Sequence, residues 1–187
     1  NIQSEVASHY LIKKNGEIVI FVPDSYVAWH AGVSAWKKYK FLNQNSIGIE
    51  ISNPGHQFGY KKFSLKQVNS LIKLSKFLIK KYKINKKNIL GHSDIAPLRK
   101  KDPGENFPWK YLAKKNIGFW HNLKNNELNK LRNKKCNKIL NNKFFANLYK
   151  IGYSKNYKKQ NEKLLIKAFQ RRFRPSLING IIDQECL

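Results

Sequence analysis

The first hundred residues alternate between short apolar runs and polar turns, a pattern that predicts a sheet of brief strands. Two apolar runs, at residues 10–13 and 18–22, flank the dipeptide Asn15-Gly16. Asn-Gly between two such runs is the strongest short signal for a β-hairpin. A third run, at residues 46–51, predicts a buried strand that a single charge, Glu50, interrupts.

A long amphipathic helix is predicted after the third run. Ser64 can cap its start, and Gln67, three residues on, can complete a capping box. Apolar side chains then recur at helical spacing, with lysines on the other face: Val68, Leu71, Ile72, Leu78, Ile79 and Tyr82. The helix leads to Ile89-Leu90, which has the character of the end of a buried strand. The pattern therefore predicts a β-α-β crossover that brings Glu50 and His92 to the same edge of the sheet.

The last third of the chain has a different pattern. Its polarity rises, and short amphipathic helices are predicted at residues 139–149 and 162–173. We therefore expect an α/β fold with a central mixed β-sheet and flanking helices, followed by a small all-helical C-terminal module. The expected domains are a first domain at residues 1–121, a linker at 122–137 and the helical module at 138–187.

Composition narrows the class of protein without identifying it. The 187 residues can hold one sizeable domain and a small appendage, and no run of 18 or more apolar residues predicts a membrane-spanning helix. The formal charge of +26 comes mainly from lysines spread along the chain. It fits a solvated basic face or attraction to an anionic cell wall or membrane surface, and we do not expect nucleic acid as the primary partner. Cys136 and Cys186 could form a disulfide in an oxidising compartment, but their number alone does not decide this.

The segment from Gly91 to Gly104 carries the strongest candidate chemistry. Its two prolines and flanking glycine predict a fixed, non-helical loop with His92 and Asp102 at its two ends. An imidazole and a carboxylate that return to one point are zinc-type ligands, and Lys100 adds a cation beside them. The alternative is a core histidine and an aspartate that caps a turn, and the spacing alone does not exclude it.

Two further features each allow two interpretations. The loop at residues 25–44 is rich in aromatic side chains, including Trp29. It is either a lid over the core or the wall of a groove that stacks sugar rings or packs on peptide. Glu50, between two isoleucines, either faces solvent through strand alternation or points into a functional site.

Several segments occur together in an informative order. They are Ser8-His9-Tyr10-Leu11-Ile12, Ala28-Trp29-His30-Ala31-Gly32, Leu42-Asn43, Ser46-Ile47-Gly48-Ile49-Glu50, Gly91-His92-Ser93-Asp94-Ile95-Ala96-Pro97, Arg99-Lys100, Asp102-Pro103-Gly104 and Phe107-Pro108-Trp109. Together they resemble the N-acetylmuramoyl-L-alanine amidases, a zinc amidase superfamily that also includes phage lysozyme-type amidases and peptidoglycan recognition proteins. The resemblance is strongest to its periplasmic, lipoprotein-like branch.

The resemblance implies a hydrolase that uses Zn²⁺. Its substrate would be the amide bond between the lactyl group of N-acetylmuramic acid and L-alanine of the peptidoglycan stem peptide. His92 and Asp102 match two zinc ligands of the family, and the third, a histidine, is expected upstream of Asn1. Glu50 matches the residue that activates the catalytic water, and Lys100 the residue that stabilises the oxyanion.

The resemblance also suggests ligand contacts. Candidate substrate-binding residues are Trp29, His30, Asn43 and Arg99. His9 matches the family position that follows the missing ligand, so it is not assigned to the metal. Residues 168–175, followed by Asn179-Gly180 and Asp183, resemble a three-helix peptidoglycan-binding module, and the resemblance implies a further helix of that module after Leu187. The alternative is a helical cap that only stabilises the first domain.

Location and partners follow from the same resemblance. We expect a monomer without a transmembrane segment, acting on peptidoglycan or a muropeptide in the periplasm or cell envelope, with any export or lipid-attachment signal upstream of residue 1. A cytoplasmic recycling enzyme is the alternative location. The alternative function is a recognition protein that binds muropeptides without cutting them. The presence of all four matched residues, Glu50, His92, Lys100 and Asp102, argues against it.

Overall fold

The computed structural model of the chain describes residues 7–187. The chain divides into two compact units. The first contains the residues up to Ser34, Tyr39–Leu90 and Asn106–Phe119, and the second contains Ala35–Lys38, Gly91–Glu105 and Trp120–Leu187.

A three-stranded mixed sheet forms the centre of the first unit, with the strand order β2-β1-β5. β1 (Tyr10–Ile12) and β2 (Ile18–Ile20) pair antiparallel and confirm the predicted hairpin. β5 (Ile49–Ile51) pairs with β1 in parallel, with Leu11 opposite Glu50. Glu50 is therefore fixed in register beside the buried central strand.

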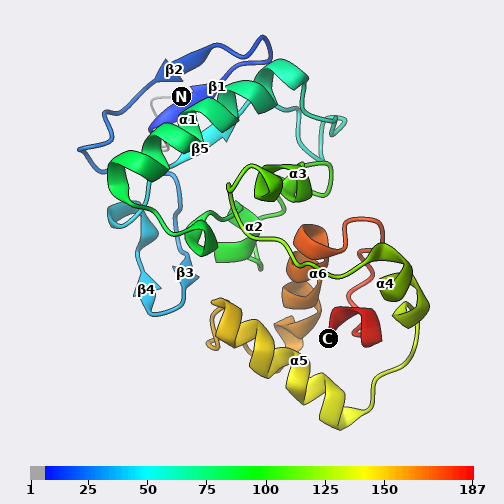
Figure 1. Cartoon of the computed structure of the whole chain (residues 1–187). Helices are drawn as coiled ribbons and strands as arrows, with labels where there is room; N and C mark the ends of the chain where they lie inside the picture. The colour runs from blue at the N-terminus through cyan, green and yellow to red at the C-terminus, as the bar shows by residue number, and fades with distance from the viewer. Residues whose placement is uncertain (1–6) are drawn as a thin grey trace. The chain divides into compact units, whose positions relative to one another are not determined.

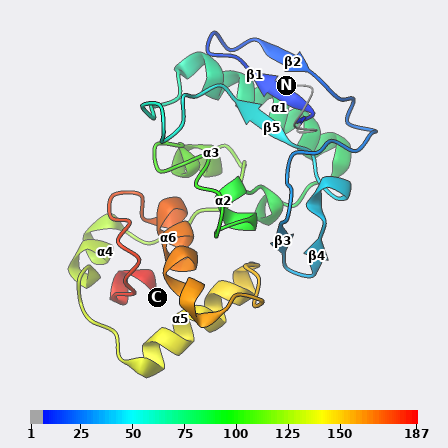
Figure 2. The same cartoon turned by 180° about the vertical axis from the view of Figure 1, so that it is seen from behind.

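Helix α1 (Leu65–Tyr82) covers one face of this sheet (Figures 1 and 2). The predicted capping box is confirmed, because Ser64 Oγ accepts the N–H of Gln67 while Gln67 Oε1 accepts the N–H of Ser64. The buried apolar side chains of the helix are Val68, Leu71, Leu74 and Leu78. Ser70 Oγ donates to the carbonyl of Gly16 at 2.6 Å, which joins the helix to the hairpin turn.

Short elements complete the first unit. They are β4 (Tyr39–Lys40), η1 (Leu42–Gln44), η2 (Lys86–Asn88) and α3 (Trp109–Lys114). The rings of Phe63 and Phe107 meet edge to face at 5.3 Å, and those of Phe107 and Trp109 at 4.6 Å. This aromatic cluster anchors the start of α3 in the core.

Helices dominate the second unit. α5 (Lys138–Ile151) and α6 (Glu162–Phe173) confirm the two predicted C-terminal helices. The other elements are β3 (Ala35–Trp36), α2 (His92–Ile95), α4 (Asn125–Leu131), η3 (Lys159–Asn161) and η4 (Gln184–Cys186). α4 lies inside the stretch that the sequence suggested as a linker. The mixed sheet with its helices and the helical C-terminal part together confirm the predicted fold class.

The predicted strand before His92 is wrong. Within residues 7–187, no strand is formed between α1 and the loop that begins at Gly91. Asn85 Oδ1 accepts the N–H of Lys87 and caps η2, and the chain then continues in extended form through Ile89. Two apolar residues were too short a signal for a strand. The parallel pairing in the sheet comes instead from β1 and β5.

The prediction that the prolines forbid a helix in the Gly91–Gly104 loop is also wrong. Helix α2 begins at His92, where the Asp94 carboxylate accepts the N–H of Gly91 at 2.8 Å and caps the turn. The helix ends before Pro97, as expected because a proline disfavours helical backbone at the residue that precedes it, here Ala96. The prolines limit the helix to one turn and do not prevent it.

Two further observations concern the helices and the thiols. No helix within residues 7–187 is both long and apolar enough to cross a membrane. Cys136 and Cys186 are both free thiols. The Cys186 thiol is buried and lies 3.4 Å from Asp183 Oδ1.

Candidate metal centre

One loop of the second unit brings an imidazole and a carboxylate together. His92 Nδ1 lies 3.0 Å from Asp102 Oδ2. The N–H of Ser93 donates to the carbonyl of Asp102 at 2.8 Å, so the backbone ties the two ends of the loop. The side chains of His92 and Asp102 are 18% and 56% exposed, which leaves the pair open to solvent.

The pair fits zinc in both chemistry and spacing. Zinc binds imidazole nitrogen and carboxylate oxygen, and two ligand atoms on a tetrahedral zinc lie about 3.3 Å apart. The distance between Nδ1 and Oδ2 is close to that value. In the part of the chain that the structure describes, no three or more His, Cys, Asp and Glu side chains gather as a metal cluster. Since a catalytic zinc takes three protein ligands, this pair is two thirds of a set.

Cationic side chains lie close to the pair. Arg99 Nη2 is 3.4 Å from His92 Nε2. Partial burial by itself would raise the pKa of Asp102, but the hydrogen bond and electrostatic attraction of His92, with smaller contributions from a backbone hydrogen bond and from Lys100, outweigh it and hold that pKa below its usual range. The carboxylate is therefore ionised at neutral pH, which is the form that binds a metal ion.

The predicted substrate-binding residues of the first unit are held by local contacts. The two ring nitrogens of His30 each lie 2.9 Å from an oxygen, one a backbone carbonyl and the other Ser46 Oγ. Asn43 Oδ1 accepts the N–H of Ala31 at 2.7 Å. Trp29 is 61% exposed. Of these three candidates, Trp29 thus has the most surface to offer a ligand.

Glu50 follows the alternation that the sequence suggested. Its side chain is exposed on β5, between the half-buried Ile49 and Ile51. The matched residues are divided between the units: Glu50, Trp29, His30 and Asn43 belong to the first, and His92, Arg99, Lys100 and Asp102 belong to the second.

His9 has the contacts of a core histidine. It is 1% exposed, its Nδ1 accepts the N–H of Gly48 at 3.0 Å, and its Nε2 lies 3.0 Å from the carbonyl of Tyr26. Its ring meets that of His30 edge on at 5.3 Å. Because both nitrogens are engaged, these contacts support leaving His9 out of the metal-ligand set.

Sequence patterns assigned no role to Asp94, which the structure places at the centre of a buried polar cluster. Asp94 is 1% exposed and is bonded to Tyr153 and Arg172, which are 59 and 78 positions away in the chain. The available signal was an acidic residue in the first turn of a short helix. No residue near Asp94 in the sequence indicated that Tyr153 and Arg172 would be its partners.

Comparison with known proteins places these residues in context. Residues 1–105 match the N-acetylmuramoyl-L-alanine amidase family. The chain is 36% identical over 195 residues to the N-acetylmuramoyl-L-alanine amidase AmiD of Escherichia coli strain K12, an alignment that covers 97% of the chain and 71% of AmiD. It is 42% identical over 113 residues to the 1,6-anhydro-N-acetylmuramyl-L-alanine amidase AmpD of Haemophilus influenzae, which covers 59% of each protein.

Solved structures agree with the sequence matches. The structure of E. coli AmiD in complex with anhydro-N-acetylmuramic acid-L-Ala-D-gamma-Glu-L-Lys matches with a TM-score of 0.83 and 35% identity, over 98% of this chain and 77% of that one. AmpDh3 of Pseudomonas aeruginosa matches with a TM-score of 0.84 and 30% identity, over 98% and 80% of the two chains. Both matches extend through the C-terminal helices.

Proposed function

The chain belongs to the N-acetylmuramoyl-L-alanine amidase family, and from that premise we propose how its own residues carry out the reaction. The reaction is hydrolysis of the amide bond between N-acetylmuramic acid and L-alanine in peptidoglycan fragments. The observation that carries the proposal is the 3.0 Å approach of His92 Nδ1 to Asp102 Oδ2 in a solvent-open loop.

His92 and Asp102 supply two ligands of a zinc ion in this proposal, and a histidine that precedes Asn1 supplies the third. When bound, zinc polarises an amide carbonyl and makes a water molecule acidic enough to lose a proton near neutral pH. Arg99, 3.4 Å from His92 Nε2, adds positive charge that favours an anionic substrate at this site.

Glu50 is the general base and Lys100 the oxyanion partner. The Glu50 carboxylate takes one proton from the attacking water as its oxygen bonds to the carbonyl carbon, and later gives that proton to the leaving nitrogen as the C–N bond breaks. The Lys100 ammonium donates to the carbonyl oxygen while it carries negative charge, a contribution of about 3 to 4 kcal/mol for one good donor. The products are the lactyl carboxylic acid and the amine of L-alanine, and transfer of the second proton of the water from the acid to the amine leaves a carboxylate and an ammonium group.

The proposed substrate contacts come from two segments, the aromatic loop at residues 25–44 and the metal-binding loop. We assign Trp29 to stacking on a sugar ring or packing on peptide, because its indole is 61% exposed. His30 and Asn43 position the loop that carries it through their local contacts, and their direct contact with substrate stays a prediction from the family resemblance. Arg99 binds a carboxylate of the stem peptide, for which a guanidinium has matching geometry.

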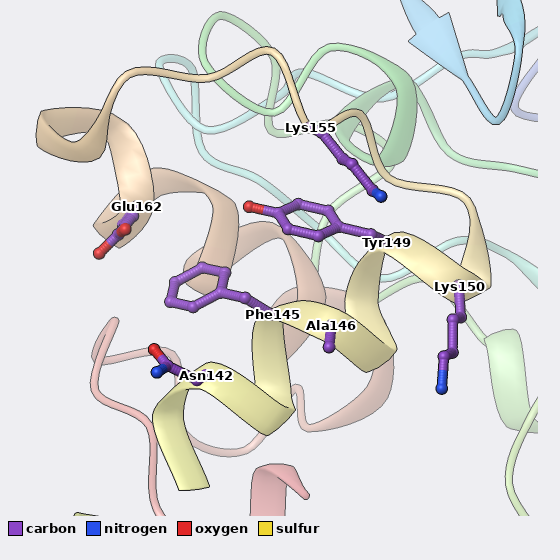
Figure 3. Close-up of a pocket in the computed structure, with 7 residues that line it drawn as sticks. All are labelled: Asn142, Phe145, Ala146, Tyr149, Lys150, Lys155 and Glu162. Carbon is purple, nitrogen blue, oxygen red and sulfur yellow. The ribbon is translucent and has the colours of Figure 1, made fainter. Parts of the chain in front are cut away.

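The C-terminal part, which we keep as a domain at 138–187 after a linker at 122–137, is assigned to wall binding. A groove of about 710 Å³ lies along α5, with Phe145 and Tyr149 in its wall (Figure 3). Lys150, Lys155 and Glu162 also line it. Aromatic rings beside ammonium groups suit the sugar rings and carboxylates of peptidoglycan, which supports the assignment. We place the protein in the periplasm or cell envelope, as a monomer, with the cytoplasm as the alternative.

The test is turnover of purified peptidoglycan and of anhydromuropeptide, with and without a chelator. It uses the full gene product that contains residues 1–187. Chelation is expected to stop the reaction and added Zn²⁺ to restore it. A protein that binds muropeptide but releases no product with zinc present would be a recognition protein, and the proposal would be wrong.

Two substitutions separate the roles of base and ligand. Glu50→Ala is expected to lower kcat by at least about 100-fold while zinc stays bound. Asp102→Ala is expected to lose the metal, with zinc affinity at least about 100-fold weaker. Lys101→Ala, next to Asp102 and exposed, is the matched control. Near-normal turnover by Glu50→Ala would contradict the base assignment without affecting the ligand assignment.

A further inference from the structure

The Asp94 carboxylate lies at the meeting point of three segments of the second unit. Its Oδ2 accepts the N–H of Gly91 at 2.8 Å and Nη1 of Arg172 at 2.5 Å. Its Oδ1 accepts the hydroxyl of Tyr153 at 2.6 Å. Asp94, Arg172 and Tyr153 are 1%, 4% and 2% exposed, so these bonds are shielded from water. Charge-assisted bonds in such surroundings are strong and geometrically exact.

This cluster is connected directly to the metal-binding pair. Asp94 caps the helix whose first residue is His92, and the next residue, Ser93, donates its N–H to the Asp102 carbonyl. Helix α2 has only four residues and is too short to be stable by itself. The orientation of His92 toward Asp102 therefore depends on what holds Asp94 in place.

Two consecutive arginines of α6 hold the loop at two points. Arg172 binds Asp94 near the start of the loop, and Arg171 Nε lies 3.6 Å from Glu105 Oε2 at its end. Tyr153, just beyond α5, adds the third contact, and its own ring packs edge on against Trp36 at 5.1 Å. The loop is thus attached to the C-terminal helical part at two points: at Asp94, between His92 and Asp102, and at Glu105, just beyond Asp102.

We propose that Arg172 and Tyr153 are positioning residues of the metal centre. They fix Asp94, and Asp94 fixes α2 so that His92 and Asp102 face one ion. This inference rests on the proposed function, since it concerns the geometry of the zinc ligands. It also gives the C-terminal helices a part in catalysis, distinct from any contact with the cell wall.

The experiment compares Arg172→Met with Arg174→Met in the full gene product. Arg174 lies two residues further on, is also 4% exposed, and pairs at 2.5 Å with another buried aspartate, Asp183, outside the metal-binding loop. The readouts are the zinc dissociation constant by chelator competition, kcat and KM for anhydromuropeptide, hydrogen exchange of residues 91–105, and urea unfolding.

Arg172→Met is expected to weaken zinc binding and lower kcat by about 10-fold or more, the usual loss when a residue that supports a metal ligand is removed. KM should change by less than about threefold, and amides of the loop should exchange faster. Arg172→Lys, which keeps one charged donor, should recover part of the zinc affinity. Arg174→Met should destabilise the protein to urea but leave zinc affinity and kcat within about twofold.

The proposal is overturned if Arg172→Met unfolds more easily yet binds zinc and turns over substrate as well as Arg174→Met does. If Arg172→Met does not fold, Tyr153→Phe replaces it, with an expected loss of zinc affinity of about threefold to 10-fold. Failure of the proposed function looks different. In that case the parent protein itself would bind no zinc, or would cleave muropeptide in the presence of the chelator.

Discussion

Two buried arginines near the end of α6 have almost the same surroundings and different connections. Arg172 and Arg174 are equally buried, and each lies 2.5 Å from a buried aspartate. The partner of Arg172 is Asp94, 78 positions earlier in the metal-binding loop. The partner of Arg174 is Asp183, only nine positions later.

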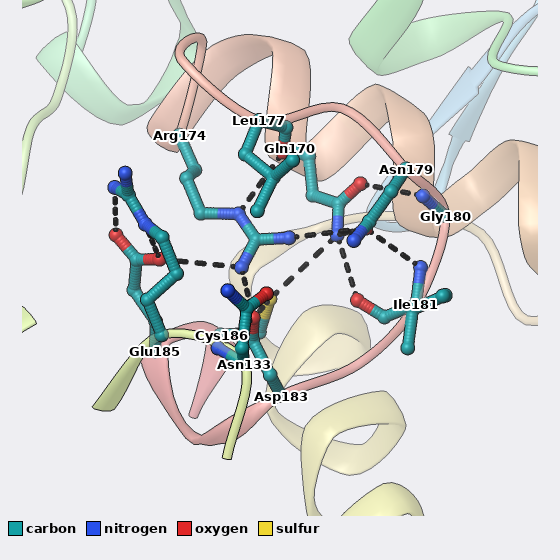
Figure 4. Close-up of polar contacts among 11 residues, drawn as sticks. Asn133, Gln170, Arg174, Leu177, Asn179, Gly180, Ile181, Asp183, Glu185 and Cys186 are labelled. Atoms are coloured by element: carbon teal, nitrogen blue, oxygen red, sulfur yellow. Dashed lines mark hydrogen bonds and ion pairs between the residues drawn. The ribbon is translucent and has the colours of Figure 1, made fainter. Parts of the chain in front are cut away.

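The Arg174 cluster closes the C-terminal segment on itself (Figure 4). Arg174 also donates to the carbonyl of Leu177 at 3.1 Å and lies 3.2 Å from Glu185, which in turn binds Arg132 through two bonds of 2.6 and 2.7 Å. Burial by itself would raise the pKa of Asp183, but the bonds from Arg174 and a backbone N–H outweigh it and hold that pKa low.

The comparison indicates that two chemically alike buried ion pairs differ in their effect on function because they are attached to different segments of the fold. Neither pair is strong evidence of net stability, because removing two charges from water offsets much of their attraction. Loss of one partner is nevertheless costly in both. In the Arg174 cluster we expect the loss to reduce only the stability of the fold. In the Arg172 cluster, formed by Arg172, Asp94 and Tyr153, we expect it also to disturb the positions of His92 and Asp102.

The largest expected effect on stability comes from breaking the Arg174 cluster. Asp183→Ala leaves Arg174 buried with only part of its countercharge and removes the acceptor of the Asn133 N–H. The free energy of unfolding should fall by about 3 to 5 kcal/mol, measured by urea denaturation. Lys163→Met, at an exposed site on α6, is the control and should change the free energy of unfolding by less than about 0.5 kcal/mol.

The zinc affinity of the folded Asp183→Ala protein should stay within about twofold of that of the parent. The hydrogen bonds of Asp183 described above join it to Asn133 and Arg174, and none of them reaches the Arg172 cluster. A loss of stability below about 1 kcal/mol would show that Glu185 alone can neutralise Arg174. A large loss of zinc affinity would show that the two arginine clusters act as one, and the comparison would fail.

The second prediction uses the thiol of the same cluster. Burial raises the pKa of Cys186 from its ordinary value of 9.0 to about 11. Above pH 9 the unfolded chain loses this proton while the native protein keeps it, so stability is full below pH 9 and falls as the pH rises toward 11. Two pH units correspond to a loss of up to about 3 kcal/mol.

Urea unfolding between pH 8 and pH 11 tests this loss, with Cys186→Ala as the comparison. The alanine variant should lose less stability over that range than the parent. Burial beside the Asp94 charge also raises the pKa of Tyr153, so both proteins retain a further alkaline loss from the other cluster. Identical slopes for the parent and Cys186→Ala would contradict the prediction.

Local sequence signals were enough for most of the elements. Asn15-Gly16 specified the hairpin, and Ser64 with Gln67 specified the start of α1, because turns and caps depend on residues a few positions apart. The approach of His92 to Asp102 was predictable for the same reason, since both belong to one short loop. The roles of Glu50 and Lys100 came only from family resemblance and remain predictions.

What failed, or was missed, depends on distant residues. The apolar pair Ile89-Leu90 predicts the end of a strand, but a strand needs a partner strand, and a pattern of two residues cannot show that the partner is absent. The capping of α2 by Asp94 was within reach of local reasoning. Its pairing with Arg172 was not, because 78 positions separate them and no periodicity connects a loop to a helix face.

The smallest expected effect concerns a single hydroxyl in the Arg172 cluster. Tyr153→Phe removes the donor that lies 2.6 Å from Asp94 Oδ1 and keeps the ring that packs against Trp36. Arg172 still neutralises the carboxylate, so the loss of stability should be about 1 to 2 kcal/mol, the cost of one unsatisfied buried acceptor. Tyr149→Phe, in the groove wall, should cost less than about 0.5 kcal/mol by urea denaturation.

The two arginine clusters are distinguished by comparing the loss of zinc affinity with the loss of stability in each variant. Although Tyr153→Phe should destabilise the protein less than Asp183→Ala does, it should weaken zinc binding more, because only Tyr153 reaches Asp94 and through it the turn that begins at His92. If the loss of zinc affinity instead followed the loss of stability across both variants, zinc would report only the folded fraction. The Arg172 cluster would then only stabilise the fold, as the Arg174 cluster does.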